Sequence, residues 1–165
     1  MTPDNLYPLL LPTATVGCGI IAGLFFIFSI CIMKALSHLP SSQGMAAMQS
    51  INLVILNPAF FVVFFGTSAA CLLVVITALS NDLSPGSEFV LGGGILYLVG
   101  SLLVTAAFNV PLNNALAAAD PEAPDSESFW ADYLGKWTAW NHARTVASIL
   151  ATASFVIAIG QWSVQ

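Results

Sequence analysis

The chain carries little charge, and positive charge is the scarcer kind. Only 7% of its 165 residues are charged, with three Lys and Arg against eight Asp and Glu. Three basic side chains are too few to meet the phosphates of a nucleic acid, so the composition excludes a nucleic-acid partner. With a net charge of −5, a polybasic anchor on anionic lipid is excluded as well.

Several motifs of soluble enzymes are also missing. Cys18, Cys31 and Cys71 all lie in apolar stretches, and no CxxC pair occurs. Because a thiol oxidoreductase needs paired and accessible thiols, we interpret the three cysteines as small buried hydrophobic side chains. No GxSxG, P-loop or GxGxxG pattern occurs in a plausible context.

Apolar sequence is what the chain has in abundance: 58% of residues are hydrophobic, and the mean hydropathy is +0.88. Four stretches, about 12–36, 51–79, 89–110 and 137–160, are long enough, or nearly so, to cross a bilayer as helices. We therefore predict an all-α integral membrane protein, a single four-helix transmembrane bundle. Since no positive charge precedes the first long apolar run, we expect no cleaved signal peptide.

Two further helical segments flank these spans. A helix that begins at Gln43 is predicted to run straight into the second span and to kink at Pro58, which frees the carbonyl of Val54. From Ser126, aromatic residues recur at helical spacing before the fourth span. This pattern predicts a short amphipathic helix in the membrane interface.

The three basic residues, Lys34, Lys136 and Arg144, belong to the side of the membrane that holds the first-to-second and third-to-fourth connections. The positive-inside rule then places both termini outside and the basic side at the cytoplasmic face. Gly19 and Gly23 have the GxxxG spacing that lets helices approach closely. This spacing is compatible with a homodimer and equally with packing inside one chain.

Polar residues gather on the same side. The helices are interrupted by proline at 57–58 and at 109–113, and one face of the fourth span carries Arg144 among aromatic and amide residues. Broken backbone at membrane depth is tolerated where it lines a cavity, and an ionisable residue there is a functional candidate. We predict a pocket one or two turns below the interface. The candidate site residues are Arg144, His38, His142, Asn52, Asn57, Asn109, Asn113, Trp137, Trp140 and Asn141.

Each candidate also has a purely structural interpretation. Arg144 could extend to the interface and pair with an acid of the third loop. The asparagines could cap carbonyls released by the prolines, and the tryptophans could belong to an aromatic belt. His38 fits a general base, a metal ligand or a solvated turn residue. His142 points roughly 100° or more away from Arg144 around the helix, which favours packing against a neighbouring helix or capping of a backbone carbonyl.

A metal site is poorly supported. The two histidines are far apart in the sequence, and no carboxylate lies at membrane depth. Such a set falls short of the usual ligands, so we expect no metal.

Two groups of motifs resemble one family. Gly-Met-Ala-Ala-Met-Gln-Ser-Ile-Asn at 44–52, Asn-Pro-Ala-Phe at 57–60 and Phe-Gly at 65–66 resemble its first half. Asn-Val-Pro-Leu-Asn at 109–113 and Trp-Thr-Ala-Trp-Asn-His-Ala-Arg-Thr at 137–145 resemble its second half. This is a family of small four-helix membrane proteins, long known only as a domain of unknown function, that includes fungal and bacterial anthrone oxygenases. We expect the chain in the inner (plasma) membrane of a bacterium.

The resemblance implies oxygen insertion at the activated methylene of a tricyclic phenol, without a bound metal, flavin or other cofactor. Such chemistry needs a base for the C–H proton, a cation or donors for the oxyanion, and a dry aromatic slot. On this hypothesis His38 or His142 is the base and Arg144 holds the enolate oxygen. Asn109, Asn113 and Asn141 would orient the phenols, and Trp137 and Trp140 would stack on the rings.

Two other functions remain open from the sequence. A non-enzymatic membrane protein, such as a carrier, a small-molecule-binding subunit or a partner-stabilising bundle, needs only that the amides and Arg144 hold the helices together. A metal-handling protein would use the two histidines and is disfavoured by the ligand count. Whichever function applies, we expect the lipid bilayer and a small hydrophobic or aromatic ligand as the partners of the protein.

Overall fold

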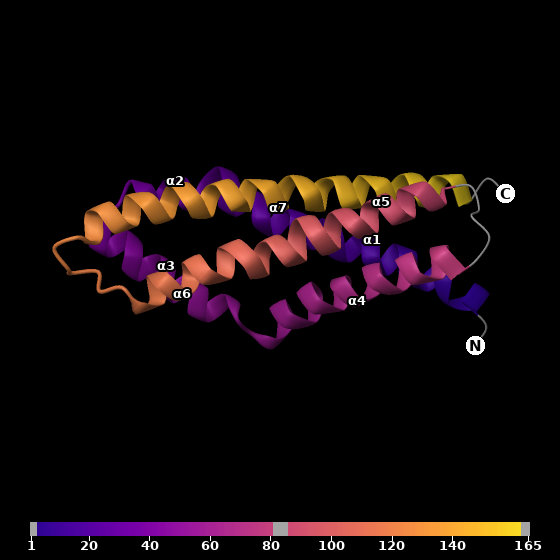
Figure 1. Cartoon of the computed structure of the whole chain (residues 1–165), viewed down its shortest axis with the longest axis horizontal. Coiled ribbons are helices and arrows are strands. Elements are labelled where there is room, and N and C mark those ends of the chain that lie inside the picture. The colour runs from indigo at the N-terminus through magenta and orange to yellow at the C-terminus, as the bar shows by residue number, and fades with distance from the viewer. Residues whose placement is uncertain (1–2, 81–85, 163–165) are drawn as a thin grey trace.

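Long helices packed side by side make up the protein in a computed structural model that describes residues 3–80 and 86–162 (Figure 1). In chain order the helical elements are α1 (Pro3–Ile27), η1 (Phe28–Ile32), α2 (Met33–Ser37), α3 (Ser41–Ile55), α4 (Pro58–Ser80), α5 (Ser87–Tyr97), η2 (Leu98–Leu103), η3 (Thr105–Asn109), α6 (Val110–Ala118) and α7 (Ser126–Trp162). The three η elements are π-helical turns inside longer helices. No strand occurs in the described ranges.

Four helices are long and apolar enough to cross a membrane. They are Leu9–Ser37, Pro58–Ser80, Ser87–Ala118 and Ser126–Gln161. The prediction of an all-α four-helix membrane bundle is therefore confirmed. Figure 1 shows the α2–α3 turn and the α6–α7 loop at one end, here called the loop end. The start of α1, the end of α7 and the α4–α5 junction lie at the opposite end.

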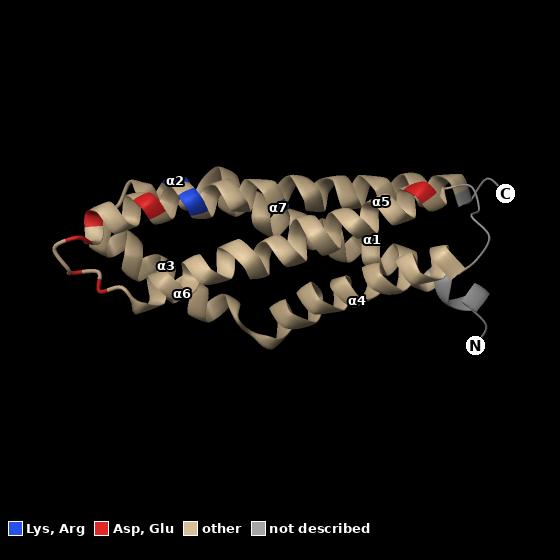
Figure 2. Cartoon of the chain, viewed as in Figure 1, with Lys and Arg blue, Asp and Glu red and all other residues tan. Residues whose placement is uncertain are grey.

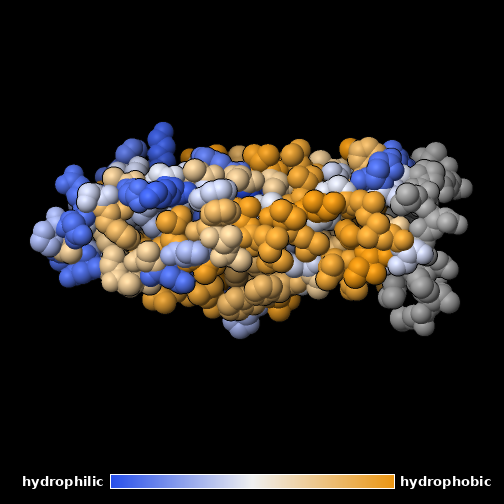
Figure 3. Space-filling view, in the orientation of Figure 1, coloured by the Kyte–Doolittle hydropathy of each residue, from blue (hydrophilic) through white to orange (hydrophobic). Residues whose placement is uncertain are grey.

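Polar and apolar surface separate along the bundle. Figure 3 shows apolar residues over its middle and toward the end opposite the loops, whereas hydrophilic residues gather at the loop end. Most of the acidic residues drawn in Figure 2 lie at the loop end too, where Lys136 pairs with Asp132 at 2.8 Å. The loop end is therefore the part of the described chain best suited to a membrane–water boundary.

The helices pack through two buried clusters. One joins α1, α4, α5 and α7 and includes Cys18, Phe64 and Tyr97; the other lies at the loop end and includes Met45 and Trp130. Cys18 and Cys71 are buried with their Sγ atoms 3.8 Å apart. Cys31 is exposed, which differs from our interpretation of all three cysteines as buried.

Close approach of α1 and α4 depends on Gly17, not on the GxxxG pair. A Cβ at Gly17 would overlap the Thr67 side chain, whereas one at Gly23 would meet nothing within 4 Å and one at Gly19 would only touch Thr152 at 3.8 Å. Gly23 therefore lies open on the surface of α1. A homodimer through Gly19 and Gly23 stays a prediction.

We expect Gly17→Ala to destabilise the bundle by about 1–3 kcal/mol, because overpacking a tight contact forces neighbouring groups apart. Gly23→Ala is the matched control on the same helix, and it should change stability by no more than about 1 kcal/mol. Thermal unfolding of both variants in one detergent checks this. Equal midpoints for the two variants would show that α1 and α4 are not in close contact at Gly17.

Two segments differ from what the sequence pattern predicts. The expected continuous helix from Gln43 into the second span is broken: α3 ends at Ile55, Leu56 has φ −79° and ψ 61°, and α4 begins at Pro58. The expected interfacial helix from Ser126 is instead the first part of α7, which continues without interruption to Trp162. Periodicity alone cannot distinguish a kink from a break, nor two helices from one.

Candidate functional site

The α3–α4 break is held by the side chain of Asn57. Its Nδ2 donates to the carbonyl of Val54 at 3.0 Å, and its Oδ1 accepts from the backbone N–H of Phe60 at 3.1 Å. One amide thus caps the end of α3 and the start of α4, where proline removes a backbone donor. The carbonyl of Val54, which we expected to be freed, has its partner here.

Asn57→Ala should therefore lower stability by about 1–2 kcal/mol, the usual cost of losing an N-cap, with a further contribution from the uncapped Val54 carbonyl. Asn57→Asp keeps the acceptor for Phe60 and loses only the donor, so its loss should be smaller. Thermal unfolding in detergent ranks the three proteins. The account of the break is wrong if the alanine variant is as stable as the wild type.

The second proline interruption produces no break. A π-helical turn, η3, precedes Pro111, and the helix continues into α6. A π turn rearranges the backbone hydrogen bonds locally, which lets a helix continue past an irregular position. Asn109, at the end of this turn, is buried and donates its Nδ2 to the carbonyl of Trp137 at 3.2 Å. Asn109 thus ties this helix to α7.

A cavity of about 160 Å³ lies between α1, α3, α4, the η3–α6 segment and α7. Its wall is largely apolar and includes seven aromatic residues, and four polar side chains reach it. The aromatic residues are Phe25, Phe28, Phe60, Phe61, Phe64, Phe65 and Trp137; the polar ones are Asn52, Thr105, Asn113 and Arg144. The walls come from segments far apart in the sequence, so the cavity exists only in the folded bundle.

Arg144 is buried, with 6% of its surface exposed, and its guanidinium is fixed on several sides. Its Nε donates to Asn141 Oδ1 at 3.0 Å, and its Nη1 donates to Thr105 Oγ1 at 3.3 Å. The Cζ atom lies 4.0 Å from the ring centroid of Phe25 and 4.9 Å from that of Trp137. Both distances are within the range of cation–π attraction.

No carboxylate balances this charge in the described part of the chain. The one ion pair found there joins Lys136 to Asp132, so Arg144 does not pair with the third loop as its structural interpretation would have it. A buried cation without a counter-ion costs several kcal/mol of desolvation. Since the guanidinium lines the cavity, an anion bound there would supply the missing partner.

The other polar groups of the cavity also offer donors. Asn113 Oδ1 accepts from Trp137 Nε1 at 2.7 Å and from the Tyr133 hydroxyl at 3.0 Å, which leaves its Nδ2 for another acceptor. Asn52 Nδ2 is buried near the Tyr133 hydroxyl and has no hydrogen bond of acceptable geometry with any described residue. The cavity is therefore rich in donors and suited to an oxygen-bearing, acceptor-rich ligand.

Asn141 supports Arg144 from behind. It is fully buried, and its Nδ2 donates to the carbonyl of Phe25 at 2.8 Å and to Ser29 Oγ at 2.7 Å. These bonds connect α7 to α1 just where η1 interrupts the α-helical pattern. Because the same side chain accepts from Arg144, Asn141 links the guanidinium to the backbone of α1 at Phe25, whose ring lies against the guanidinium.

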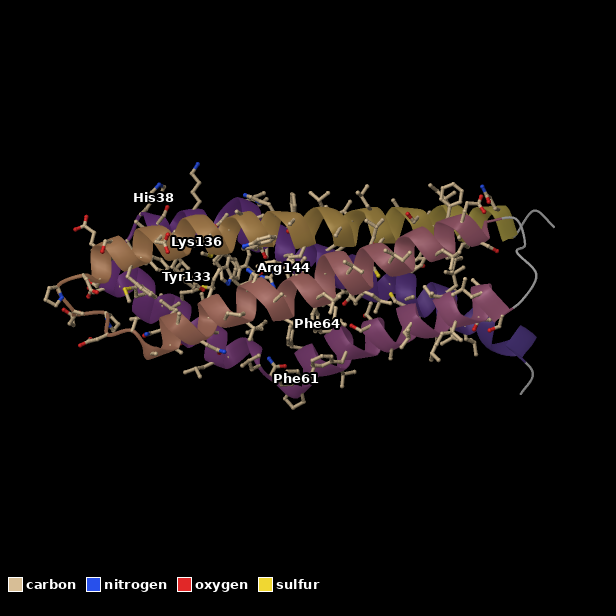
Figure 4. The ribbon with its side chains drawn as sticks, in the orientation of Figure 1. His38, Phe61, Phe64, Tyr133, Lys136 and Arg144 are labelled. Atoms are coloured by element: carbon tan, nitrogen blue, oxygen red, sulfur yellow. The ribbon has the colours of Figure 1, made fainter. Side chains whose placement is uncertain are left out.

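The structure does not bring the two histidines to the cavity. His38 is exposed at the end of α2, and Figure 4 shows it toward the loop end and away from Arg144, Phe61 and Phe64. His142 is exposed in an outer groove that also contains Lys34. Among the described residues, no three His, Cys, Asp or Glu side chains cluster as metal ligands would.

Of the ten candidates, Arg144, Asn52, Asn113 and Trp137 line the cavity. Trp140 instead stacks on Phe108, with ring centroids 3.6 Å apart. Sequence reasoning missed Phe25 and Thr105, the partners of Arg144, since nothing in the sequence relates them to α7. It also missed Phe61 and Phe64, although aromatics at 60, 61, 64 and 65 have the spacing of one helical face after Pro58.

The sequence of the chain matches one known protein family. The profile described as anthrone oxygenase matches residues 60–154, more than half of the chain. The chain belongs to the anthrone oxygenase family. No curated protein and no solved structure matches the chain.

The part matched to the anthrone oxygenase family covers both second-half motifs, and with them Arg144, Asn141, Asn113 and Trp137. It begins at residue 60, so the resemblance at 44–52 and most of that at 57–60 lie outside it, whereas the resemblance at 65–66 lies inside. The α4 aromatics of the cavity fall inside the match, whereas Phe25 and Asn52 come from the part outside it. About half of the cavity lining therefore comes from the matched segment and the other half from α1, η1, α3 and the α3–α4 break.

Proposed function

We propose that this anthrone oxygenase family member is a membrane-embedded oxygenase that binds an activated phenolic, anthrone-type or similar hydrophobic substrate as its enolate. The observation that carries the proposal is a buried guanidinium, without a counter-ion among the described residues, that lines an aromatic cavity. An enolate oxygen supplies the anion that Arg144 lacks. The flat aromatic rings of such a substrate match the walls formed by Phe25, Phe64 and Trp137.

In the proposed reaction Arg144 stabilises the negative charge that develops on the substrate oxygen. The substrate methylene loses a proton, and the negative charge settles on the enolate oxygen beside Arg144 and the Asn113 amide. The electron-rich carbon reduces O₂ and bonds to it, giving a hydroperoxide. Loss of a second C–H proton with cleavage of the O–O bond forms the ketone. One oxygen atom stays in the quinone, and the other leaves as water.

In this reaction the protein binds and orients the substrate and excludes solvent from it. Asn141 and Thr105 fix the guanidinium before substrate arrives, so that little reorganisation accompanies ionisation. Since no His, Asp or Glu among the described residues lines the cavity, we assign the first proton to water rather than to His38 or His142. Because the substrate itself reduces O₂, the reaction as proposed runs without a metal or flavin.

The test is turnover of an anthrone by purified, chelator-treated protein under ¹⁸O₂. The proposal expects one O₂ consumed per quinone formed, with one ¹⁸O atom in the quinone and the rate unaffected by metal removal. Heat-denatured protein gives the spontaneous background. A rate no higher than that background would refute the oxygenase for this substrate and favour the non-enzymatic binding protein or carrier.

We also propose that the loop end, with Lys34 and Lys136, faces the cytoplasm of a bacterial inner membrane and that both termini lie outside. The support is the positive-inside rule applied to those two lysines. Alkaline phosphatase fused to the C-terminus is active only outside the cytoplasm, so the proposal expects an active fusion. An inactive but well-expressed fusion would reverse the orientation.

A further inference from the structure

We propose that the cavity opens sideways into the bilayer, through a mouth formed at the α3–α4 break by Leu56, Phe61, Phe65 and Val110. We propose further that the cavity encloses only the oxyanion-bearing edge of its ligand. The opposite edge of the ring system would stay in the mouth, against lipid. The identity of the ligand in this inference rests on the proposed function. The position of the mouth is independent of it.

Exposure increases from the inner wall of the cavity to one side. Phe25, Phe64 and Trp137 are each 3% exposed. On the side of the break, the lining residues Leu56, Phe61 and Phe65 are 58%, 40% and 53% exposed. Figure 4 shows Phe61 at the outer edge and Phe64 between it and Arg144. The cavity is therefore closed by α1 and α7 and open between α4 and α6.

The break is what creates this opening. At Leu56 the backbone leaves the helical conformation, so α3 and α4 do not continue along one axis. A straight helix would carry its side chains past the cavity without a gap, whereas here the chain bends outward between the two helices (Figure 1). The Asn57 cap makes the bend a fixed feature, because it satisfies the backbone groups that the bend leaves unpaired.

The mouth faces lipid rather than water. Phe61 and Phe65 lie on the first two turns of α4, a 23-residue span that contains no Asp, Glu, Lys or Arg. Val62, beside them on the same helix, is 72% exposed, and on a span of this length and composition such exposed apolar side chains are suited to contact with acyl chains. Leu56 and Val110 complete an entirely apolar rim.

The size of the cavity limits what it encloses. Its volume of about 160 Å³ is close to that of an engineered cavity, about 150 Å³, that binds a single benzene. A tricyclic substrate cannot fit inside completely. With donors at the inner end and apolar residues at the mouth, the ligand enters oxyanion edge first and leaves its far edge among Phe61, Phe65 and Leu56.

Specificity should follow the same division. Bulky substituents on the oxyanion-bearing edge beside Arg144 should weaken binding, because the buried side chains of Phe25, Phe64 and Trp137 close that end of the cavity. Apolar substituents on the far edge should be accepted, since they extend into lipid. Such a ligand partitions into the membrane and carries its acidic oxygen on one edge.

The experiment places nitroxide spin labels at single cysteines in a Cys31→Ser background, with the protein reconstituted in vesicles. Phe61→Cys and Phe65→Cys probe the mouth, Val62→Cys is a lipid-facing control outside the cavity lining, and Ser128→Cys is an exposed loop-end control. We expect labels at 61 and 65 to collide with O₂ and to be shielded from a water-soluble nickel complex, as at 62. A label at 128 should show the reverse.

The same labels test entry. A bulky label at 61 or 65 should lower kcat/KM for an anthrone by about tenfold or more by obstructing association, whereas a label at 62 should leave it unchanged. Nickel access at 61 and 65 would overturn a lipid-facing mouth, and unchanged kcat/KM would overturn entry through it. If the wild type has no turnover, the collision measurement still decides the first point. Binding of a hydroxyanthraquinone, followed by tryptophan fluorescence, then decides the second.

Discussion

Arg144→Ala is expected to lower kcat/KM for an anthrone by about 10²–10³-fold, the range seen when one oxyanion-stabilising donor is removed. The guanidinium is already oriented by Asn141, Thr105 and the Phe25 ring. Its loss therefore removes both the charge and the fixed donors at the enolate oxygen. Steady-state oxygen uptake, corrected for the spontaneous rate, measures the effect.

Arg144→Lys separates charge from geometry. An ammonium retains a positive charge but cannot present the planar fork that spans Asn141 and the cavity, so turnover should fall between wild type and Arg144→Ala. Equal activity of the lysine variant and the wild type would mean that only the charge matters. Activity of the alanine variant equal to the wild type would remove Arg144 from the mechanism.

Stability provides the control for these variants. Arg144→Met fills a similar volume without a charge, and it removes the desolvation cost of several kcal/mol that burying an unpaired guanidinium carries. We expect its thermal midpoint to equal or exceed that of the wild type while its turnover is lost. A large drop in the midpoint would show that Arg144 holds the helices together, as the non-enzymatic interpretation requires.

Asn141→Asp should abolish most turnover even though Arg144 remains in place. The substitution puts a carboxylate where Asn141 Oδ1 now accepts from Arg144 Nε at 3.0 Å. An ion pair at that distance gives the guanidinium an internal counter-ion, and the advantage of binding an enolate largely disappears. We expect a loss of about 10²-fold in kcat/KM, mostly through weaker binding of the anionic form.

A matched control keeps the added charge away from the cavity. Ala139 is exposed on α7 and does not line the cavity, so Ala139→Asp adds the same carboxylate without contacting Arg144. Its turnover should match the wild type. Asn141→Asp also removes the donors to Phe25 and Ser29, so the folded fraction of each variant is measured first. Full activity of well-folded Asn141→Asp would contradict the role of an unbalanced charge.

The fold was readily predicted because bilayer-length apolar stretches leave few alternatives. In the hydrocarbon core all backbone groups must be paired, and in a chain with four such stretches only helices satisfy this locally. The break at Pro58 was harder, since the sequence shows the proline but not whether Asn57 closes both helix ends. That outcome depends on the directions that α3 and α4 take when they pack.

The site was predicted in part, and for a clear reason. Arg144, Asn141 and Trp137 share one region of α7, which helical spacing reveals. Phe25 and Thr105 come from other helices, and their contact with Arg144 depends on how those helices rotate and pack. The two histidines were candidates by chemistry alone, and the fold leaves both on the surface. The type of a residue shows whether its side chain is reactive, whereas helix packing determines whether that side chain lines the cavity.

The central claim is that the cavity binds its substrate as an anion held by Arg144. An anaerobic absorbance titration tests it directly, because an anthrone and its enolate absorb at different wavelengths and no reaction proceeds without O₂. At neutral pH the wild type should show the enolate spectrum on binding, and Arg144→Ala should not. A bound ligand with the neutral spectrum in the wild type would contradict the account.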